Sequence, residues 1–551
     1  MVAVLFPTLT FAVFFAVVLA VGWRLSDQPV QWKLFMVVAS YVFYVWWDPV
    51  FCLLLAGATV GNQLVAKAIG RSGTDRTARA WMILGVVGDL AILGFFKYYG
   101  FFVDSLIGLL EPVGLAPTSI VMRVVLPVGV SFFLFCAISY LVDVYRQHQE
   151  PIGFLDFAVY LSFFPHLVAG PIVRVSEFAP QLARRRNPDS IDATRAVRLI
   201  CRGLFKKVVI ANFLATAIVD PVFAAPSSAT NLELAVGAWA YAVQIYADFS
   251  GYTDIAIGVA LMLGIKFPQN FDRPYSATSL QDFWRRWHMT LSRWLRDYVY
   301  IPLGGNRGGK RAEERNLVIT MGLGGLWHGA SWNFVIWGLL HGFGLVTERW
   351  WRERPPRVID LRDRVNRGDD DENDGRGDPG ERPRGAPPAR SPWLPSSSPS
   401  LRLPRRTSSI RPAGPSPSGS HDTTVMARPD IETDARPMRT EPNPWISRLI
   451  VFNFVTFAWI FFRAPDLPAA FAYLTGLVTN WGVGTMVTPM VVVAIVVGLA
   501  GQFVPPRLGD ALEYRASRLP AGWLGIGVGL WLVVINLLGP QGIAPFIYFQ
   551  F

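Results

Sequence analysis

Apolar residues along this chain gather in stretches of about 20, separated by short polar connections. That length lets an α-helix cross the hydrocarbon core of a bilayer while it satisfies its own backbone polar groups. The pattern therefore predicts an all-α polytopic membrane protein with about 11 or more membrane helices. The expected spans are 3–23, 33–47, 49–66, 80–96, 124–143, 446–463, 487–504 and 521–539, with shorter apolar pieces at 100–110 and 468–478.

Three apolar regions depart from a simple span. Residues 153–170 are interrupted by Pro165 and Gly170, which indicates a kinked or re-entrant piece. Residues 191–224 mix basic with apolar side chains and are expected to form an amphipathic helix at the cytoplasmic surface.

The third region is the long apolar run over residues 231–264. It is broken, in polarity, by the stretch YADFSGYTD at 246–254. Asp248 and Asp254 within that stretch are costly in a membrane unless they face protein or water.

Basic residues predict the orientation and the division of the chain. The connection after the third span carries Lys67, Arg71, Arg76 and Arg79, so it is expected in the cytoplasm, with the amino terminus outside. Residues 351–445 are rich in Pro, Ser, Arg, Asp and Gly, which predicts a disordered, cytoplasmic linker. The linker divides a membrane core over 1–350 from helices over 446–551 that complete it.

The overall composition agrees with a membrane protein. Of the 551 residues, 52% are hydrophobic and only 17% are charged, against about 25% in an average soluble domain. The net charge of +11 is explained by basic cytoplasmic loops, because no nucleic-acid-binding motif is present. The three cysteines are far apart and suggest neither a metal site nor a disulfide framework.

The stretch from Ser279 to Gly342 holds three of the six histidines. Ser279 followed by Asp282 is a capping-box-like start for a helix. At 100° per residue, this helix has one aromatic face and one face with four arginines, and His288 lies at the boundary between them. The arginines are Arg285, Arg286, Arg293 and Arg296. His288 is either turned partly into the protein or is a solvated histidine at the membrane surface.

His328 stands in the sequence GGLWHGAS, within apolar surroundings. Glycines on both sides allow another chain or an extended ligand to approach the imidazole closely. A neutral imidazole at that depth can act as a general base, and the alternative is a histidine packed between helices. An acyl transfer here would run without an obvious serine nucleophile: His328 would deprotonate a hydroxyl acceptor, which then attacks a bound acyl thioester directly.

Other chemistries find no support in the sequence. His288, His328 and His341 show no H-E-x-x-H or comparable spacing, so a metal site is not expected, and His341 is interpreted as structural. Neither a G-x-S-x-G nucleophile motif nor a Walker A motif is present.

The quoted motifs resemble those of the membrane-bound O-acyltransferases, above all the bacterial branch that includes alginate O-acetyltransferase. The resemblance rests on RRWHMTLSRWLRDYVYIPLGGNRGG, GGLWHGASWNFVIWGLLHG, LPVGVSFFLFCAISYLVDVYR (126–146), YLSFFPHLVAGPIVR (160–174), YADFSGYTDIAIGVALMLGIKFPQNFDRPY (246–275), FAWIFFRAP (457–465) and the ending FIYFQF. It covers most of residues 1–350 and 446–551, whereas 351–445 is an insertion relative to the family.

The resemblance implies a helical bundle with a thin centre, re-entrant and interfacial helices, and a funnel on each side. His328 would be the catalytic histidine and His288 a supporting one. A cytoplasmic donor, acetyl-CoA or an acyl-carrier thioester, would meet an acceptor from outside. Arg285, Arg286 and Arg293 could attract that anionic donor, or else anchor to lipid head groups. No tightly bound cofactor is expected.

The reaction implied is acyl transfer, most simply of acetyl, to an extracellular polysaccharide or to a secreted SGNH-type acetyltransferase partner. D-alanyl transfer to teichoic acid is the alternative within the enzyme class. A transporter without covalent chemistry is the alternative outside it, although no internal repeat of the kind common in transporters is evident.

Overall fold

The computed structural model describes residues 6–113, 122, 124–168, 170–184, 186–188, 191–353 and 443–539. Residues 1–350 and 444–551 belong to one compact unit and 351–443 to another. The predicted linker falls outside the described residues over 354–442, and so does the FIYFQF ending. The described ends of the predicted linker, 351–353 and 444–445, belong to helices.

All regular elements in the described ranges are helical, which confirms the predicted fold class. The first part of the unit contains α1 (Leu9–Arg24), α2 (Pro29–Val45), α3 (Pro49–Arg71), α4 (Asp75–Leu93), the π-helix η1 (Gly94–Tyr98), α5 (Tyr99–Leu110), η2 (Glu111–Val113), α6 (Val130–Tyr145), α7 (Phe154–Ser162), α8 (Phe164–Leu167) and α9 (Val175–Ala183). Side chains at Thr8, Asp48 and Thr74 accept hydrogen bonds from the first turns of α1, α3 and α4, which explains where these helices begin.

The middle and the end of the unit continue in the same way. They contain α10 (Ala193–Leu204), η4 (Phe205–Ala211), α11 (Asn212–Leu214), η5 (Ala215–Val219), α12 (Asp220–Ala224), α13 (Asn231–Met262), η6 (Pro274–Ser276), α14 (Leu280–Arg286), α15 (Met289–Leu295), η7 (Arg296–Tyr300), α16 (Lys310–His328), α17 (Trp332–Glu353), α19 (Pro444–Arg463), α20 (Leu467–Thr479), α21 (Pro489–Ala500), α22 (Pro506–Ser517) and α23 (Ala521–Leu538). The sequence reading did not anticipate α22.

Four described helices are both long and apolar enough to cross a membrane: Pro49–Arg71, Asp75–Val113, Ala193–Ala224 and Pro444–Arg463. Six shorter apolar helices of 10–17 residues accompany them. A multi-pass helical membrane protein is therefore confirmed, whereas the count of about 11 spans stays a prediction. The break predicted in 153–170 is present, because α7 ends at Ser162 and α8 begins before Pro165.

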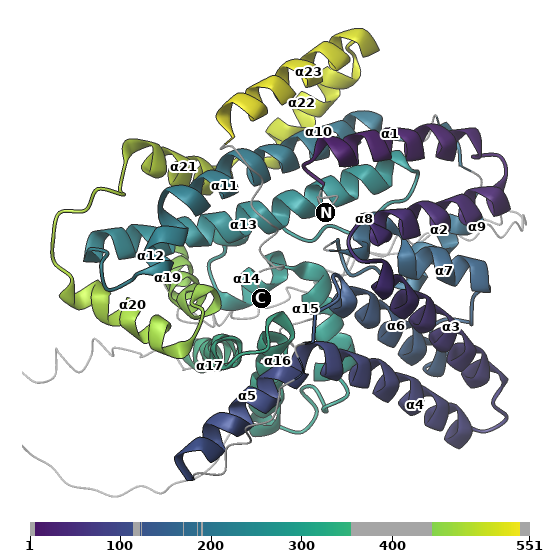
Figure 1. The fold of residues 1–551 in the computed structure, drawn as a ribbon, viewed down its shortest axis with the longest axis horizontal. Coiled ribbons are helices and arrows are strands. Elements are labelled where there is room, and N and C mark those ends of the chain that lie inside the picture. Colours follow the sequence, from purple (N-terminus) through teal and green to yellow (C-terminus); the bar gives the residue numbers. More distant parts are fainter. Residues whose placement is uncertain are drawn as a thin grey trace, which may run out of the picture. The chain divides into compact units, whose positions relative to one another are not determined.

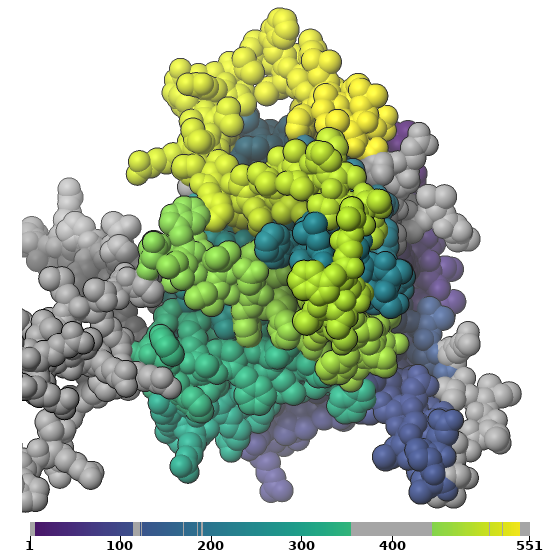
Figure 2. All heavy atoms as spheres, turned by 90° about the vertical axis from the view of Figure 1, so that its left-hand side faces the viewer, coloured from purple at the N-terminus to yellow at the C-terminus, as the bar shows by residue number. Residues whose placement is uncertain are grey.

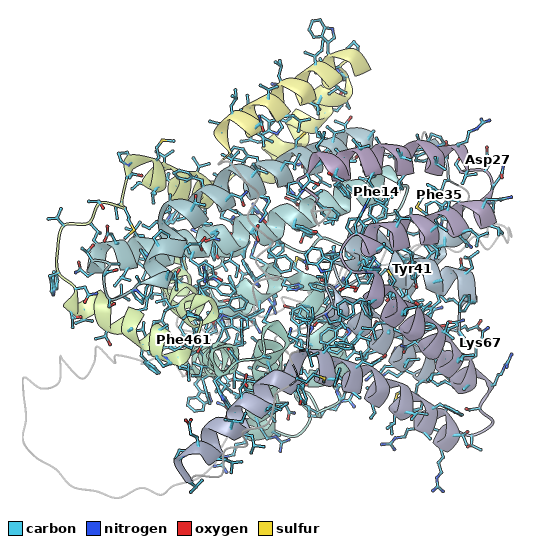
Figure 3. The ribbon with its side chains drawn as sticks, in the orientation of Figure 1. Phe14, Asp27, Phe35, Tyr41, Lys67 and Phe461 are labelled. Carbon is cyan, nitrogen blue, oxygen red and sulfur yellow. The ribbon has the colours of Figure 1, made fainter. Side chains whose placement is uncertain are left out.

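The first four helices form two hairpins whose turns reach the same edge of the molecule (Figure 1). Figure 3 shows Asp27 in the α1–α2 turn and Lys67 near the end of α3 at that edge. This edge carries the basic α3–α4 connection, which the positive-inside rule assigns to the cytoplasm. The orientation itself remains a prediction.

The long helix α13 lies at the centre of the unit, and the helical run from α10 to α12 follows it (Figure 1). The acids that the sequence placed in apolar surroundings face this run. Lys207 forms an ion pair with Asp248, and Arg202 and Lys206 both bond Asp254, the lysine at 2.9 Å. The polar stretch 246–254 lies within one continuous helix, α13. Residues 191–224 were expected as an amphipathic surface helix, whereas they form a helical run that packs along α13 and is long and apolar enough to cross a membrane.

Glycines allow this close packing. A Cβ at Gly251 would lie 2.8 Å from the Gly203 carbonyl oxygen. A larger residue at position 251 would therefore force the backbones of α10 and α13 apart. Three helices near the end of the chain, α19, α20 and α21, cover another side of α13. Figure 2 shows these yellow-green helices lying against the teal middle of the chain.

The Lys207–Asp248 pair generates a stability prediction, since both side chains are only 3% exposed. We expect Lys207→Met to lower the free energy of unfolding by about 3–5 kcal/mol, because it leaves a buried carboxylate without its cation. The double variant Lys207→Met/Asp248→Leu should recover most of this loss. Thermal unfolding of the detergent-solubilised protein measures both.

The control is Arg198→Met, which removes the more exposed pair with Glu513 and should cost less than about 1 kcal/mol. A double variant as unstable as the single one would contradict this interpretation of the pair.

Candidate functional site

His328 is the last residue of α16, where this helix meets α17. The two helices cross closely because a Cβ at Gly325 would lie 2.2 Å from the Phe334 carbonyl oxygen and 2.9 Å from Gly338 Cα. A Cβ at Gly329 would collide with the ring of Phe334. The glycines around His328 therefore allow a close contact between α16 and α17 of the same chain.

Aromatic rings surround the His328 imidazole. The ring centroids of Trp327, Trp337 and Phe462 lie 4.9, 5.0 and 5.2 Å from that of His328. The histidine is 3% exposed. Phe462 belongs to α19, so residues on both sides of segment 354–442 build the site.

His288 lies at a break that the sequence did not predict. Instead of one amphipathic helix from Ser279, α14 ends at Arg286 and α15 begins at Met289. His288 stands between them with φ +40°, a left-handed conformation that is uncommon outside glycine. The Ser279 start is confirmed, because its hydroxyl accepts from the Asp282 N–H at 2.9 Å.

Asn270 compensates for this break. Its backbone oxygen accepts from the Met289 N–H at 2.9 Å, and its side-chain oxygen accepts from the Thr290 N–H and hydroxyl at 3.1 and 2.8 Å. These bonds satisfy donors that the new helix start would otherwise leave without partners. Asn270 comes from FPQNFDRPY, a segment 18 residues earlier in the chain.

The same oxygen fixes the protonation pattern of His288. A backbone N–H can only donate, so the side-chain carbonyl oxygen of Asn270 must face Thr290. His288 Nδ1 lies 3.2 Å from this oxygen and must therefore carry the hydrogen. In the neutral ring, Nε2 then keeps its lone pair, and this nitrogen has no hydrogen-bond partner among the described residues.

The structure brings the two predicted histidines together. The ring centroids of His288 and His328 are 6.4 Å apart, and the Trp327 ring contacts both. His288 is fully buried, so its interpretation as a solvated surface residue is wrong. Two imidazoles at this distance can contact one small reacting group.

His341 belongs to the same cluster, one turn of α17 from Trp337. Its ring centroid lies 4.8 Å from that of Trp337, and its Nδ1 accepts from Trp284 Nε1–H at 3.3 Å. An indole nitrogen is only a donor, so this bond places the imidazole hydrogen on Nε2 of the neutral ring. His341 holds α14 against α17, in keeping with a structural role.

The arginines predicted to attract a donor lie in different settings. Arg286 pairs with Asp282 at 2.9 Å and with Asp272 at 3.7 Å, and Arg293 pairs with Glu177 at 2.9 Å. Arg285 is exposed. Arg286 and Arg293 are therefore held by acids of the same protein.

Beyond α15, Asp297 connects three of the motifs that carry the family resemblance. It binds Arg296 at 2.6 Å and also contacts Arg174, while Arg146 donates to its backbone oxygen at 3.1 Å. Burial alone would raise the pKa of the Asp297 carboxyl, but the hydrogen bonds and charges of Arg296 and Arg174 outweigh it and lower the pKa. Asp297 is therefore a charged connection that holds the end of α15 in place.

Sequence reasoning missed Asn270 and two residues from η1. Lys97 Nζ contacts the backbone oxygens of Trp327 and His328, and the Tyr98 hydroxyl donates to that of Leu326 at 2.8 Å. The available signal for Lys97 was a basic residue between two apolar pieces, 80–96 and 100–110. Within the described ranges, no group of three or more His, Cys, Asp or Glu side chains is placed to hold a metal ion.

Comparison of the sequence with known proteins identifies a family. The sequence model of MBOAT, the membrane-bound O-acyltransferase family, matches residues 5–361. The chain is 47% identical over 319 residues to the probable alginate O-acetylase AlgI of Pseudomonas aeruginosa, covering 58% of this chain and 61% of that protein. It is 40% identical to the peptidoglycan O-acetyltransferase of Helicobacter pylori, over 59% of this chain and 66% of that protein.

More distant similarity reaches the teichoic acid D-alanyltransferase of Streptococcus thermophilus, at 30% identity over 41% of this chain and 58% of that protein. The match spans about three fifths of the length of the AlgI proteins of Pseudomonas aeruginosa and Pseudomonas syringae. The family match covers well over half of the chain and includes both histidines. The chain therefore belongs to the membrane-bound O-acyltransferase family.

Proposed function

We propose that this protein is an O-acyltransferase that moves an acyl group, most simply acetyl, from a cytoplasmic thioester to a hydroxyl on the outer side. The observation that carries the proposal is the approach of His288 and His328 to 6.4 Å within one buried aromatic cluster. The names of the relatives support the reaction class, since those at 40–47% identity are called O-acetylases or O-acetyltransferases.

In this mechanism His328 is the general base. Its neutral imidazole takes the proton of the acceptor hydroxyl as the oxygen attacks the thioester carbonyl. The tetrahedral intermediate collapses by breaking the carbon–sulfur bond, and the proton passes from His328 to the leaving thiolate. An ester and a free thiol result, so no serine or cysteine nucleophile of the protein is needed.

His288 supplies an acceptor for a hydrogen bond in the same place. Because Asn270 holds the hydrogen on Nδ1, the Nε2 lone pair is available to orient the acceptor hydroxyl or a donor group near His328. A base or acceptor held in one tautomer by a second residue loses little free energy in orientation during the reaction.

The acyl group and its acceptor follow from the relatives. Acetyl transfer is favoured over D-alanyl transfer because the O-acetylating relatives share 40–47% identity and the D-alanylating one 30%. We propose an extracellular polysaccharide as the final acceptor, reached directly or through a secreted SGNH-type acetyltransferase. The donor is acetyl-CoA or an acyl-carrier thioester.

The first prediction concerns His328. We expect His328→Ala to lower acetyl transfer by about 10²–10⁴-fold, the contribution of a general base, while the protein stays inserted in the membrane. The measurement is transfer of labelled acetyl from acetyl-CoA, or from a carrier thioester, in membranes, together with the O-acetyl content of surface polysaccharide.

The matched control is His148→Ala, which removes an exposed histidine and should keep normal activity. Unchanged O-acetylation in the His328→Ala strain would refute the proposal. Turnover of D-alanyl carrier thioester in place of acetyl donors would instead identify the alternative reaction.

A second prediction tests the tautomer of His288. Asn270→Leu removes the oxygen that holds the hydrogen on Nδ1, so transfer should fall about 10- to 100-fold, as when outer partners of other functional histidines are lost. Asn270→Asp keeps an acceptor oxygen at the same place and should retain more activity than Asn270→Leu. Equal loss in the two variants, with equal amounts of folded protein, would argue against the tautomer explanation.

A third prediction separates the arginines. Arg285 is the one exposed residue of the three, so it is the most accessible to an anionic donor. Arg285→Gln should raise the donor KM by up to about fivefold without changing kcat, the effect of one exposed charge pair. Arg311→Gln, at another exposed arginine, is the control, and an equal KM change there would remove the special role of Arg285.

A further inference from the structure

Two side chains from a distant part of the chain hold the end of α16 that carries His328. Lys97 Nζ donates to the backbone oxygens of Trp327 and His328, the second at 3.2 Å. The Tyr98 hydroxyl donates to the backbone oxygen of Leu326 at 2.8 Å. Three consecutive carbonyls of the last turn of α16 therefore receive bonds from two consecutive residues about 230 positions earlier.

The chemistry of a helix end explains why these contacts matter. The last carbonyls of any α-helix lack partners within the helix, and α16 passes directly into an extended residue, Gly329, at φ −157° and ψ 151°. Trp327 and His328 are buried, so their carbonyls have little access to water and need protein donors. An ammonium group is the favourable partner there, because it also opposes the negative end of the helix dipole.

Local structure allows Lys97 and Tyr98 to reach the same helix end. Both belong to the π-helix η1 between α4 and α5. A π-helical turn is wider than an α-helical one and often occurs at functional positions. The Lys97 ammonium also lies 5.7 Å from the centroid of the Trp327 ring, which contacts both His288 and His328.

Lys97 does not behave like a lysine that merely reaches the membrane surface. Such a side chain extends its ammonium toward head groups and water. Here the ammonium turns inward to backbone oxygens, and no ion pair with an acid is recorded for it within the described residues. A cation in apolar surroundings without an acidic partner is costly, and the carbonyls of α16 are the groups that compensate for it.

We propose that Lys97 is a positioning residue for His328, assisted by Tyr98. The pair fixes the last turn of α16 and so sets the direction of the His328 imidazole relative to His288. This inference rests on the proposed function, because it assigns Lys97 an effect on catalysis through His328. It predicts that loss of the ammonium disturbs the chemical step more than donor binding.

The test compares Lys97→Met with Lys97→Arg in purified protein. The donor is acetyl-CoA or the carrier thioester, whichever the wild-type protein uses in a reaction that depends on His328. Lys97→Met should lower kcat about tenfold or more and leave the donor KM unchanged. Lys97→Arg keeps a cation that donates to carbonyls and should restore most of kcat. Asp104→Asn, at an exposed position of α5, is the control and should behave as wild type.

Tyr98→Phe keeps the inference testable if Lys97→Met does not fold, because it removes only the bond to Leu326. A smaller loss of kcat at unchanged KM supports the inference. Normal kcat in a folded Lys97→Met protein, or in Tyr98→Phe when Lys97→Met does not fold, would overturn it. Equal losses in Lys97→Met and Lys97→Arg with a raised KM would overturn it too, because they indicate general structural damage.

The His328→Ala variant separates this inference from the function on which it rests. An active His328→Ala protein refutes the proposed function and the inference together. An inactive His328→Ala protein beside a fully active Lys97→Met protein refutes the inference alone.

Discussion

The site depends on one constraint: backbone polar groups at helix ends need protein partners where water is scarce. Both histidines lie at such ends. His288 stands at a break between two short helices, and His328 closes α16. Asn270 supplies acceptors to the first end, whereas Lys97 and Tyr98 supply donors to the second. The residues that satisfy the backbone are therefore the same ones that orient the imidazoles.

This arrangement explains which parts of the site could be predicted from the sequence. The apolar stretches could be predicted as helices, because a helix that crosses a bilayer needs a minimum length of apolar sequence. The histidines could be identified because an ionisable group in such surroundings is rare and costly. The break at His288 could not be predicted, since residues 283–296 contain no proline or glycine and the break is stabilised by Asn270. A bond from a distant segment leaves no trace in local periodicity.

The sequence also left the contact partners of two other features unidentified: the glycines beside His328 and the buried acids of α13. The glycines beside His328 predicted that another group packs closely against this segment. Only the structure identifies that group as α17. Asp248 and Asp254 were expected to need partners, yet the sequence alone did not indicate that residues 191–224 would provide them. A basic amphipathic pattern suits a membrane surface and an acidic helix equally well. Tertiary contacts decide between the two.

The packing of α19 against His328 affects when the site can form during synthesis of the chain. Phe462 packs 5.2 Å from the His328 ring, and Trp459 stacks on Trp337 at 5.4 Å. Both rings are synthesised more than 100 residues after His328. The ribosome must therefore release α19 before the aromatic cluster around His328 can be complete. A nascent chain that ends before α19 therefore carries both histidines but lacks part of the aromatic cluster that surrounds them.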